Sequence, residues 1–405
     1  MVNYLPRLMD ASLQDALKRA GIVLIEGSKG CGKTETARQA AQSEVRVDID
    51  PNVKIAVGVD PMMVLDGKVP RLVDEWQVQP ILWDAARHVV DDRQKKGQFI
   101  FTGSTAPSEL VTRHSGAGRF ARLKMYTMTL AETGESTCEV SLDALATGGR
   151  AKATNSSWNI TKLCERMCFG GWPGNLGLSV KQTRSNIRDY LRTIAEVDIS
   201  TPDGVRRDPV RVMNILRSLA RGVSTEMSAT TIAVDAGISR ETAMDYLDSL
   251  SRIFISEDQP AWSRSLRSRT PLRKSPKRHL VDPALVMAAL NKGPEQLLKD
   301  LKFAGQVFES FVVHELRALT SRQVHHARLE NGLEVDALVE MDDVALVFEI
   351  KLGHAPEVVD QASENLLRFC RILDGDAVPV VVTGSGMSYQ RKDGVHVVAV
   401  NTLGK

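Results

Sequence analysis

The chain contains few cysteines, and their spacing indicates neither a disulfide framework nor a zinc site. Its five cysteines are scattered through 405 residues, and none forms a Cys-x-x-Cys pair. Cys164 and Cys168 could share one face of a helix, but small buried apolar side chains are the expected role for both. Cys31 lies in a glycine-rich loop, where a free thiol indicates a reducing cytoplasm and offers a route to inactivation by thiol modification.

The sequence also lacks long apolar runs, a signal pattern and an excess of one charge. No apolar run approaches the roughly 20 residues that a membrane span needs. The N-terminal residues show no basic-then-apolar pattern, so we expect no export. With 52 basic and 50 acidic residues, the net charge is only +2, so any nucleic-acid affinity must come from local patches. We therefore expect a cytoplasmic protein with no membrane partner and about two to four domains.

A glycine-rich loop at residues 27–34 is the most informative motif. It fits the phosphate-loop pattern G-x-x-x-x-G-K-[ST], with an apolar strand expected at 21–26 and a helix at 34–41. Glycines let backbone N–H groups face phosphate oxygens, Lys33 supplies a charge for the β/γ-phosphates, and Thr34 offers a hydroxyl to Mg²⁺. The predicted ATP contacts in the loop are Gly27, Ser28, Lys29, Gly30, Cys31, Gly32, Lys33 and Thr34.

Acidic and hydroxyl residues follow two further expected strands. Asp74 and Glu75 come after the segment 69–73, in which Arg71 interrupts the apolar residues. We assign Asp74 to Mg²⁺, largely through water, and Glu75 to activation of the attacking water. Thr102 or Ser104, ending the expected strand 97–104, is predicted to sense the γ-phosphate; a plain strand-ending turn is the alternative.

An arginine after residues 115–118 is a candidate finger for a neighbouring subunit. Arg119 is the first choice and Arg122 the second, just before a strand expected at Leu123–Leu130. Such an arginine stabilises transition-state charge on a nucleotide bound by another copy, which implies a homo-oligomer. The alternative is a solvated or salt-bridged arginine.

These segments together resemble the AAA+ superfamily. They look most like a prokaryotic family of AAA-type ATPases whose C-terminal half is a domain of unknown function. The resemblance rests on the phosphate loop and on residues 74–77, 101–104, 117–119 and 170–173. It implies a helical lid that opens at Gly170-Gly-Trp-Pro, with Pro173 near the adenine base. The polar segment Glu132–Asn159 departs from the family, and its composition predicts an exposed loop or insertion.

The middle of the chain predicts a winged helix followed by a basic run. Met227–Leu250 has a helix-turn-helix pattern in which Gly237 suits the turn and Ser239 caps a second helix that presents Arg240 early. Residues 254–256 and 278–282 are the expected wing strands. The predicted nucleic-acid contacts are Arg240, Arg264, Arg267, Arg269, Arg273, Lys274, Lys277 and Arg278.

Two other roles for this basic region stay open. The run from Arg264 to His279 has no acidic residue, and Pro271 and Pro276 keep it from being helical. It would therefore suit a solvated, flexible loop or a contact with an acidic neighbouring subunit as well as a DNA or RNA backbone. Winged helices in ATPases also serve as oligomer contacts.

The C-terminal part carries a second set of acidic residues. A helix is expected at 305–316, followed by strands at 334–340 and 344–351. Side chains alternate along a strand, so Glu349 and Lys351 should share a face that Asp336 can join. Two carboxylates at this position can bind Mg²⁺ or Mn²⁺, and the lysine can position or activate water for phosphodiester cleavage.

This order of helix and strands resembles the PD-(D/E)xK nuclease fold. In that resemblance Glu309 takes the helix position, with Glu315 as the alternative carboxylate, and Asp336, Glu349 and Lys351 fill the motif. Gln361 matches a weaker auxiliary position, whereas Val335 replaces the usual proline. The resemblance implies Glu309, Asp336 and Glu349 as metal ligands. Related domains that only bind DNA make an inactive, salt-bridged site the alternative.

The sequence as a whole predicts an α/β protein. The expected domains are a P-loop ATPase core with a parallel sheet (1–135), a loop and helical lid (136–205), a winged helix (206–290) and a restriction-endonuclease-like domain (291–405). The leading hypothesis is an ATPase that binds nucleic acid, DNA above all, or cleaves it with a metal ion. The alternative is a STAND-like nucleotide switch whose terminal domain is a non-catalytic binding module.

Overall fold

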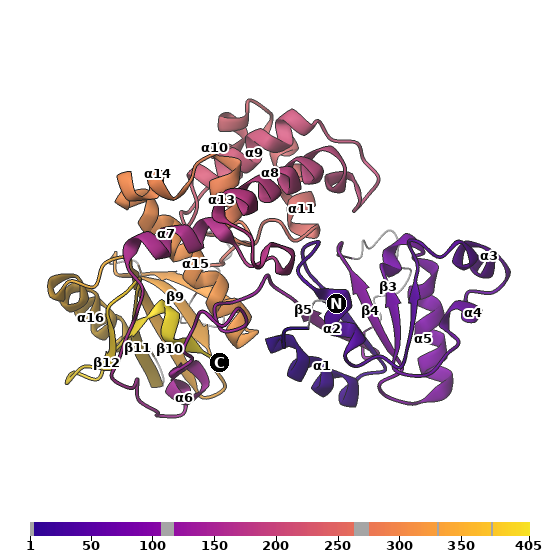
Figure 1. The fold of residues 1–405 in the computed structure, drawn as a ribbon, viewed down its shortest axis with the longest axis horizontal. Helices are drawn as coiled ribbons and strands as arrows, with labels where there is room; N and C mark the ends of the chain where they lie inside the picture. Colours follow the sequence, from indigo (N-terminus) through magenta and orange to yellow (C-terminus); the bar gives the residue numbers. More distant parts are fainter. Residues whose placement is uncertain (1–3, 107–116, 263–274, 330–331, 374–375) are drawn as a thin grey trace.

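Two α/β regions lie on either side of a helical region in the computed structural model (Figure 1). The structure describes residues 4–106, 117–262, 275–329, 332–373 and 376–405. The N-terminal region ends near residue 131, the middle region spans 160–300, and the C-terminal region comprises 301–405 together with 132–159. Five residues of the predicted basic run lie outside the described residues: Arg264, Arg267, Arg269, Arg273 and Lys274.

The N-terminal region is built on the parallel sheet that the sequence predicts. Its five strands follow the order β2-β3-β4-β1-β5. The strands are β1 (Ile22–Glu26), β2 (Ser43–Arg46), β3 (Arg71–Asp74), β4 (Phe99–Gly103) and β5 (Phe120–Lys124). The helices are α1 (Leu8–Arg19), α2 (Lys33–Arg38), α3 (Pro51–Val59), α4 (Met62–Leu65), α5 (Ile81–Arg93) and the 3₁₀ helix η1 (Trp76–Val78). All residues of β1 and β4 are buried, as parallel strands covered on both faces should be.

Strand β5 begins earlier in the sequence than expected. The prediction placed a strand at Leu123–Leu130, but the structure has it at Phe120–Lys124, where Phe120 stacks on Trp83 with ring centroids 3.8 Å apart. The backbone from Tyr126 onward leaves the sheet instead. Thr127 Oγ1 donates to Asp282 Oδ2 at 2.7 Å. Contacts with distant residues, absent from any local pattern, therefore decide where this strand ends.

The middle region is almost entirely helical. Its helices are α7 (Ile160–Phe169), η2 (Pro173–Asn175), α8 (Val180–Glu196), η3 (Asp198–Ser200), α9 (Pro209–Arg221), α10 (Ala229–Ala236), α11 (Arg240–Arg252), α13 (Pro283–Ala289) and α14 (Pro294–Lys299). Gly237 adopts φ +67° between α10 and α11, and the Ser239 side chain caps α11, as the helix-turn-helix pattern predicts. The expected wing strands, 254–256 and 278–282, form one isolated antiparallel bridge, Ser256 with Leu280, and a further bridge joins Gln259 to Lys277 just outside them.

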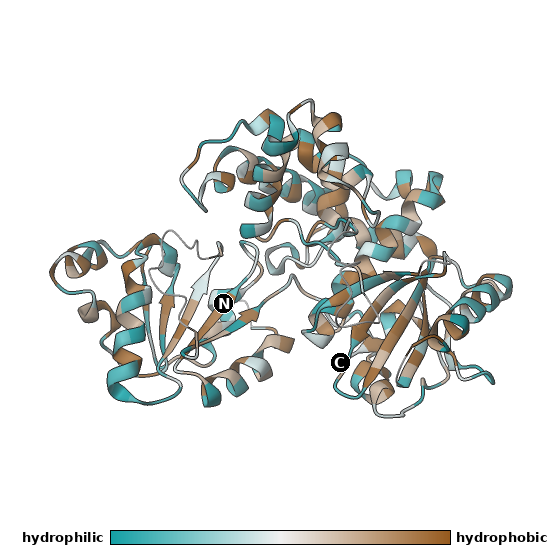
Figure 2. Ribbon diagram, turned by 180° about the vertical axis from the view of Figure 1, so that it is seen from behind, coloured by the Kyte–Doolittle hydropathy of each residue, from teal (hydrophilic) through white to brown (hydrophobic). Residues whose placement is uncertain are grey.

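The C-terminal region contains a mixed seven-stranded sheet, in the order β7-β12-β13-β11-β10-β9-β8. Its strands are β7 (Thr154–Asn155), β8 (Val324–Arg328), β9 (Glu334–Glu340), β10 (Val344–Lys351), β11 (Asp376–Thr383), β12 (Met387–Gln390) and β13 (His396–Ala399). The helices are α6 (Leu142–Ala146), α15 (Leu301–Thr320), α16 (Pro356–Cys370) and η4 (Val400–Thr402). Hydrophobic residues concentrate on the strands of both large sheets (Figure 2).

The segment Glu132–Asn159, predicted as an exposed loop or insertion, is exposed or partly exposed at most positions but also contains short strands and a helix. Its strand β7 pairs with β12, and β6 (Val140–Ser141) pairs with β14 (Leu403–Gly404) near the C-terminus. Three apolar residues of β6 and α6, Val140, Leu142 and Leu145, are at most 1% exposed. A few buried apolar residues thus anchor a largely polar segment onto the distant C-terminal sheet, which composition alone does not reveal.

One buried glutamate joins the three regions. Glu257 of the middle region accepts a hydrogen bond from Tyr126 (3.1 Å) and pairs with Lys124 of β5 (2.8 Å) and Arg317 of α15 (3.7 Å). Burial opposes ionisation of Glu257, yet Arg317 and Lys124 lower its pKa below the usual value. The carboxylate is therefore a charged junction between the N-terminal region and the rest of the chain.

Candidate functional site

The glycine-rich loop joins β1 to α2 in a shape that only glycine permits at two positions. A Cβ added to Gly27 would lie 2.2 Å from the Met125 carbonyl oxygen, and Gly32 adopts φ +109° at the start of α2. Lys33 is 6% exposed, and its Nζ donates to the carbonyl oxygens of Gly27 and Ser28, both at 2.9 Å. Within the described residues no carboxylate lies within ion-pair distance of Lys33. A buried ammonium paired only with carbonyls fits an anionic ligand such as a phosphate.

Asp74 lies beside the loop, as the two predicted strands require. Strands β3 and β4 are neighbours, and their register places Asp74 opposite Thr102. Thr34 Oγ1 donates to Asp74 Oδ1 at 2.8 Å, and Thr102 Oγ1 donates to the same oxygen. A hydroxyl and a carboxylate oxygen side by side, next to a phosphate loop, fit the oxygen ligands that Mg²⁺ takes together with nucleotide phosphates.

Glu75 and Ser104 form a second pair at the same edge of the sheet. Ser104 Oγ donates to Glu75 Oε2 at 3.3 Å, and the Gln77 amide also donates to this carboxylate. Glu75 adopts φ +53°, in the left-handed region that a non-glycine residue seldom occupies. Both expected sensors therefore touch an acidic residue: Thr102 contacts Asp74, and Ser104 contacts Glu75. We call Lys33, Thr34, Asp74, Glu75 and Ser104 the nucleotide site.

The middle region rests directly on the phosphate loop. Trp172 Nε1 donates to the Lys29 carbonyl at 3.1 Å, while Lys29 Nζ pairs with Asp198 at 2.5 Å. A Cβ added to Gly32 would lie 3.7 Å from Pro173 Cγ, so the residue predicted near the adenine base is beside the loop. A cleft of about 360 Å³ opens here, lined from the N-terminal region by Lys29, Glu75 and Ser104 and from the middle region by Thr201 and Pro202.

Arg119 is far from the nucleotide site of its own chain. It precedes β5, whose first residue Phe120 pairs with Ile22 at the opposite end of β1 from the loop. Its Nε pairs with Asp91 at 2.9 Å on an exposed surface. Arg122, the second choice, lies over the Trp83 ring at 5.8 Å. Contact of Arg119 with a nucleotide in a neighbouring copy stays a prediction.

The carboxylates predicted in the C-terminal region do converge. Lys351 Nζ lies 3.2 Å from Asp336 Oδ2 and 2.5 Å from Glu349 Oε2, because alternation along β10 directs both of its residues to the Asp336 side of the sheet. The backbone N–H of Ile350 also donates to Asp336 Oδ2 at 2.7 Å. Glu309 of α15 joins the same cluster through Lys277, which lies near both Glu309 and Asp336. We call Glu309, Asp336 and Glu349, with their lysine partners, the carboxylate site.

Two residues of this cluster were missed by the sequence analysis. Lys277, predicted as a nucleic-acid contact, pairs instead with Glu309 at 2.6 Å and lies 3.9 Å from Asp336. Asn365 of α16 donates to Glu349 Oε1 at 2.5 Å. Asn365 follows Gln361 by one helical turn, and this spacing could have revealed it. No local pattern could have separated Lys277 from the basic run around it.

The alternative helix carboxylate, Glu315, does not reach the carboxylate site. It is 1% exposed and accepts a hydrogen bond from the backbone N–H of Leu130 at 3.1 Å. Between the two helix carboxylates, the structure thus brings Glu309 to Asp336, while Glu315 fixes the segment that leaves the N-terminal sheet.

Burial and close charges shift the pKa values in the carboxylate site in opposite directions. Burial, reinforced by the neighbouring Asp336, raises the pKa of Glu309 to about 8. The same two causes raise the pKa of Glu349. Burial also opposes ionisation of Asp336, but Lys351 and Lys277 lower its pKa. Asp336 is therefore the charged acid around which the cluster is organised.

A cleft of about 600 Å³ opens onto one side of the carboxylate site, lined among others by Glu349, Lys351, Gln361 and Asn365. Three carboxylates would suit a divalent cation, but Lys277 and Lys351 already contact all three. Among the residues that the structure describes, no group of three or more His, Cys, Asp or Glu side chains is arranged to hold a metal ion. In this arrangement the acids do not fit the predicted metal site.

Two of the predicted nucleic-acid contacts line a shared surface groove. Arg240, exposed at the start of α11, and Arg278 face a hollow of about 430 Å³ together with Met244 and Pro276. Arg278 also pairs with Asp258, and its Nε donates to the Met227 carbonyl at 3.1 Å. The groove places two cations beside the N-terminal end of α11, the second helix of the helix-turn-helix pattern.

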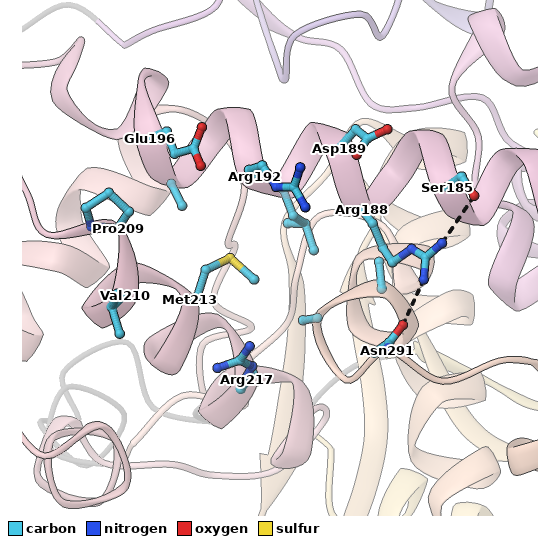
Figure 3. A pocket seen from close by; sticks show the side chains of 14 residues that line it. Ser185, Arg188, Asp189, Arg192, Glu196, Pro209, Val210, Met213, Arg217 and Asn291 are labelled. Carbon is cyan, nitrogen blue, oxygen red and sulfur yellow. Dashed lines mark hydrogen bonds between the residues drawn. The ribbon is translucent and has the colours of Figure 1, made fainter.

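A second basic cleft, not predicted from the sequence, lies between α8 and α9. It has a volume of about 770 Å³ and gathers Arg188, Arg192 and Arg217 around Met213 (Figure 3). Arg188 donates to Asn291 at 3.0 Å and to Ser185 at 3.2 Å. Arg188 and Arg192 lie one turn apart on α8, and Arg217 comes from α9, so no continuous run of basic residues marks the cleft in the sequence. Because Asp189 and Glu196 also line the cleft, its charge is mixed.

Three family matches divide the chain in sequence. Residues 19–134 match a family described as AAA domain, which supports nucleotide binding by the N-terminal region. Residues 160–296 match a domain of unknown function, DUF8612, and residues 304–403 match another, DUF4143. The first of these domains of unknown function spans residues that the sequence analysis divided between a lid and a winged helix.

Two curated relatives are described as uncharacterised proteins. Proteins Rv2008c of Mycobacterium tuberculosis and Mb2031c of Mycobacterium bovis are each 26% identical over 354 residues, 86% of this chain and 74% of theirs. Among solved structures, a variant of Thermotoga maritima RuvB is 18% identical with a TM-score of 0.27, covering 62% of this chain and 89% of that chain. A DNA replication initiation factor is 12% identical with a TM-score of 0.26, covering 60% and 86%. TM-scores this low do not establish a shared overall arrangement.

No helix among the described residues is both long and apolar enough to span a bilayer.

Proposed function

We propose that this chain binds and hydrolyses ATP and uses its nucleotide state to control binding to nucleic acid, DNA above all. The observation that carries the proposal is the meeting of Lys33, Thr34, Asp74, Glu75 and Ser104 at one edge of the parallel sheet, where residues from the middle region also contact the loop. The AAA domain match over residues 19–134 supports the nucleotide part. The nucleic-acid part rests on the basic residues.

The roles in hydrolysis follow from position. Lys33 would exchange its two carbonyl partners for phosphate oxygens, and the loop N–H groups would hold the remaining charge. Thr34 and Asp74 would hold Mg²⁺, which supplies positive charge to the phosphates when it is bound. Glu75, which accepts a hydrogen bond from the Ser104 hydroxyl, would orient the attacking water. Ser104 would sense the γ-phosphate by releasing this hydrogen bond when ATP is bound.

Completion of the site by a second copy is part of the proposal. Arg119 is exposed, and its ion pair with Asp91 is at the surface, where such pairs contribute little and are easily exchanged. A neighbouring subunit's nucleotide is the one partner that would give this arginine a role in catalysis. We therefore propose a homo-oligomer, in the cytoplasm, in which Arg119 acts in trans.

Nucleic-acid binding is proposed at the groove that Arg240 and Arg278 line. Its two cations stand next to the end of the helix α11, and the rest of the basic run follows in sequence. The N-terminal region is tied to this part of the chain, because the Ala106 N–H donates to the Arg252 carbonyl at the end of α11. Nucleotide-dependent movement at residues 104–106 would therefore reach α11 directly.

The test is DNA binding by fluorescence anisotropy with ATP, ADP and no nucleotide. Arg240→Ala should lower affinity for duplex, branched or single-stranded DNA and reduce the slope of log affinity against log salt by about 0.9. Lys292→Ala, an exposed lysine outside the groove, is the matched control and should leave both unchanged. Absence of binding to all three DNA forms in every nucleotide state would contradict the nucleic-acid part of the proposal.

A second candidate function is a nucleotide switch whose C-terminal region is a binding module without catalytic activity. One observation favours it: the lysines of the carboxylate site already neutralise its acids. The nuclease function expected from the sequence would instead require Mg²⁺- or Mn²⁺-dependent cleavage of DNA that Glu349→Ala abolishes. The switch predicts nucleotide-dependent assembly with no cleavage of any DNA form.

A further inference from the structure

We propose that Lys277 is a tethered counter-cation that keeps divalent metal ions out of the carboxylate site. This inference goes beyond the proposed function and concerns access of metal ions to the carboxylate site. Lys277 belongs to the middle region, whereas Glu309, Asp336 and Glu349 belong to the C-terminal region. The lysine therefore reaches the site from outside the sequence segment that resembles a nuclease.

The ammonium group of Lys277 occupies the space in which a metal ion bridging Glu309 and Asp336 would have to bind. Its Nζ lies 2.6 Å from Glu309 Oε1 and 3.9 Å from Asp336 Oδ1, while Lys351 Nζ takes the other Asp336 oxygen at 3.2 Å. A divalent ion bound to both acids would sit at roughly 2.0–2.6 Å from their oxygens. It would then lie against the ammonium group, where like charges repel and no room remains.

The backbone enforces this position. Lys277 and Gln259 exchange two hydrogen bonds, Lys277 N to Gln259 O at 3.1 Å and Gln259 N to Lys277 O at 2.9 Å. The Gln259 side-chain amide donates to the Asp336 carbonyl and the His325 carbonyl, each at 3.0 Å. Glutamine and lysine thus form one unit that is fixed to β9, the strand that carries Asp336. Only 17% of the Lys277 side chain is exposed.

The two neighbouring basic residues face different surroundings. Lys277 contacts the acids, whereas Arg278 lines the groove shared with Arg240. A ligand that displaces the backbone at Arg278 would therefore move Lys277 as well. The carboxylate site is closed to metal while Lys277 is in place and opens to it when the lysine is withdrawn or removed.

The test is Mn²⁺ binding to the full-length, nucleotide-free chain, followed by electron paramagnetic resonance of free Mn²⁺. Lys277→Met should bind Mn²⁺ at least about tenfold more tightly than the wild type. Addition of Glu309→Gln to that variant should abolish the gain, which locates the ion. Lys277→Arg, which keeps the charge, should behave as the wild type, and Lys292→Met is the matched control for a lost lysine.

Thermal unfolding shows whether each variant is folded, and Lys277→Gln, with a polar side chain, replaces Lys277→Met if the latter does not fold. Equal Mn²⁺ affinity in the wild type and a folded neutral variant would overturn the inference, and so would a gain that survives Glu309→Gln. Either result leaves ATP hydrolysis and DNA binding untouched, because these are measured on the other sites. Failure of those activities would instead count against the proposed function.

Discussion

The nucleotide site contains one buried lysine and the carboxylate site two partly buried lysines, and the two sites differ in what these lysines contact. Lys33 is paired with two backbone carbonyls, whereas Asp74 and Glu75 accept from hydroxyl and amide groups nearby. In the carboxylate site, Lys277 and Lys351 are paired with the acids themselves. A buried ammonium paired with carbonyls alone is prepared for an anionic ligand, whereas an acid already paired with a lysine has its charge compensated.

The comparison predicts that replacing an acid of the nucleotide site by its amide greatly lowers the rate of ATP hydrolysis but leaves ATP affinity nearly unchanged. Glu75→Gln keeps the shape of the side chain but removes the group that would orient and activate water. ATP hydrolysis, measured as phosphate release, should fall about 100-fold or more. ATP affinity of the same variant is the internal control and should stay near that of the wild type. Unchanged turnover would remove Glu75 from the mechanism.

An acid in the carboxylate site should instead matter for stability. Asp336→Ala would leave Lys277 and Lys351 without a shared partner and would break the hydrogen bond from Ile350 N–H. The free energy of unfolding, from urea denaturation, should fall by about 3 kcal/mol. Asp343→Ala, at an exposed position nearby in the chain, should change it by less than about 0.5 kcal/mol. Equal decreases in the free energy of unfolding for the two substitutions would contradict this prediction, because Asp336 would then not organise its cluster.

The elements that local patterns specify could be predicted from the sequence. The strand, loop and helix around residues 22–38 form where the apolar run, the glycines and the lysine indicate. The adjacency of Asp74 and Thr102 follows from parallel strands that end at one edge. Alternation along β10 brought Glu349 and Lys351 to Asp336 for the same reason. In each case a short repeat in the sequence fixes which way a side chain points.

The parts that could not be predicted depend on contacts between distant segments. Lys277 looks like any other member of a basic run until Gln259 and Asp336 fix its place. The ion pair of Lys29 with Asp198 joins regions far apart in sequence. The pairing of the segment Glu132–Asn159 with C-terminal strands was not predicted because its few anchoring residues are diluted among polar ones. Tertiary packing decides these features, and a single sequence carries no local signal for them.

The most direct test of the contrast is ATP binding by a matched pair of lysine variants, measured by isothermal titration calorimetry with Mg²⁺. Lys33→Met removes the ammonium that has only carbonyl partners, and Lys351→Met removes one that carboxylates already compensate. The account predicts that ATP affinity falls about tenfold to a hundredfold in Lys33→Met and is unchanged in Lys351→Met. Wild-type ATP affinity in a folded Lys33→Met protein would contradict the assignment of the nucleotide site.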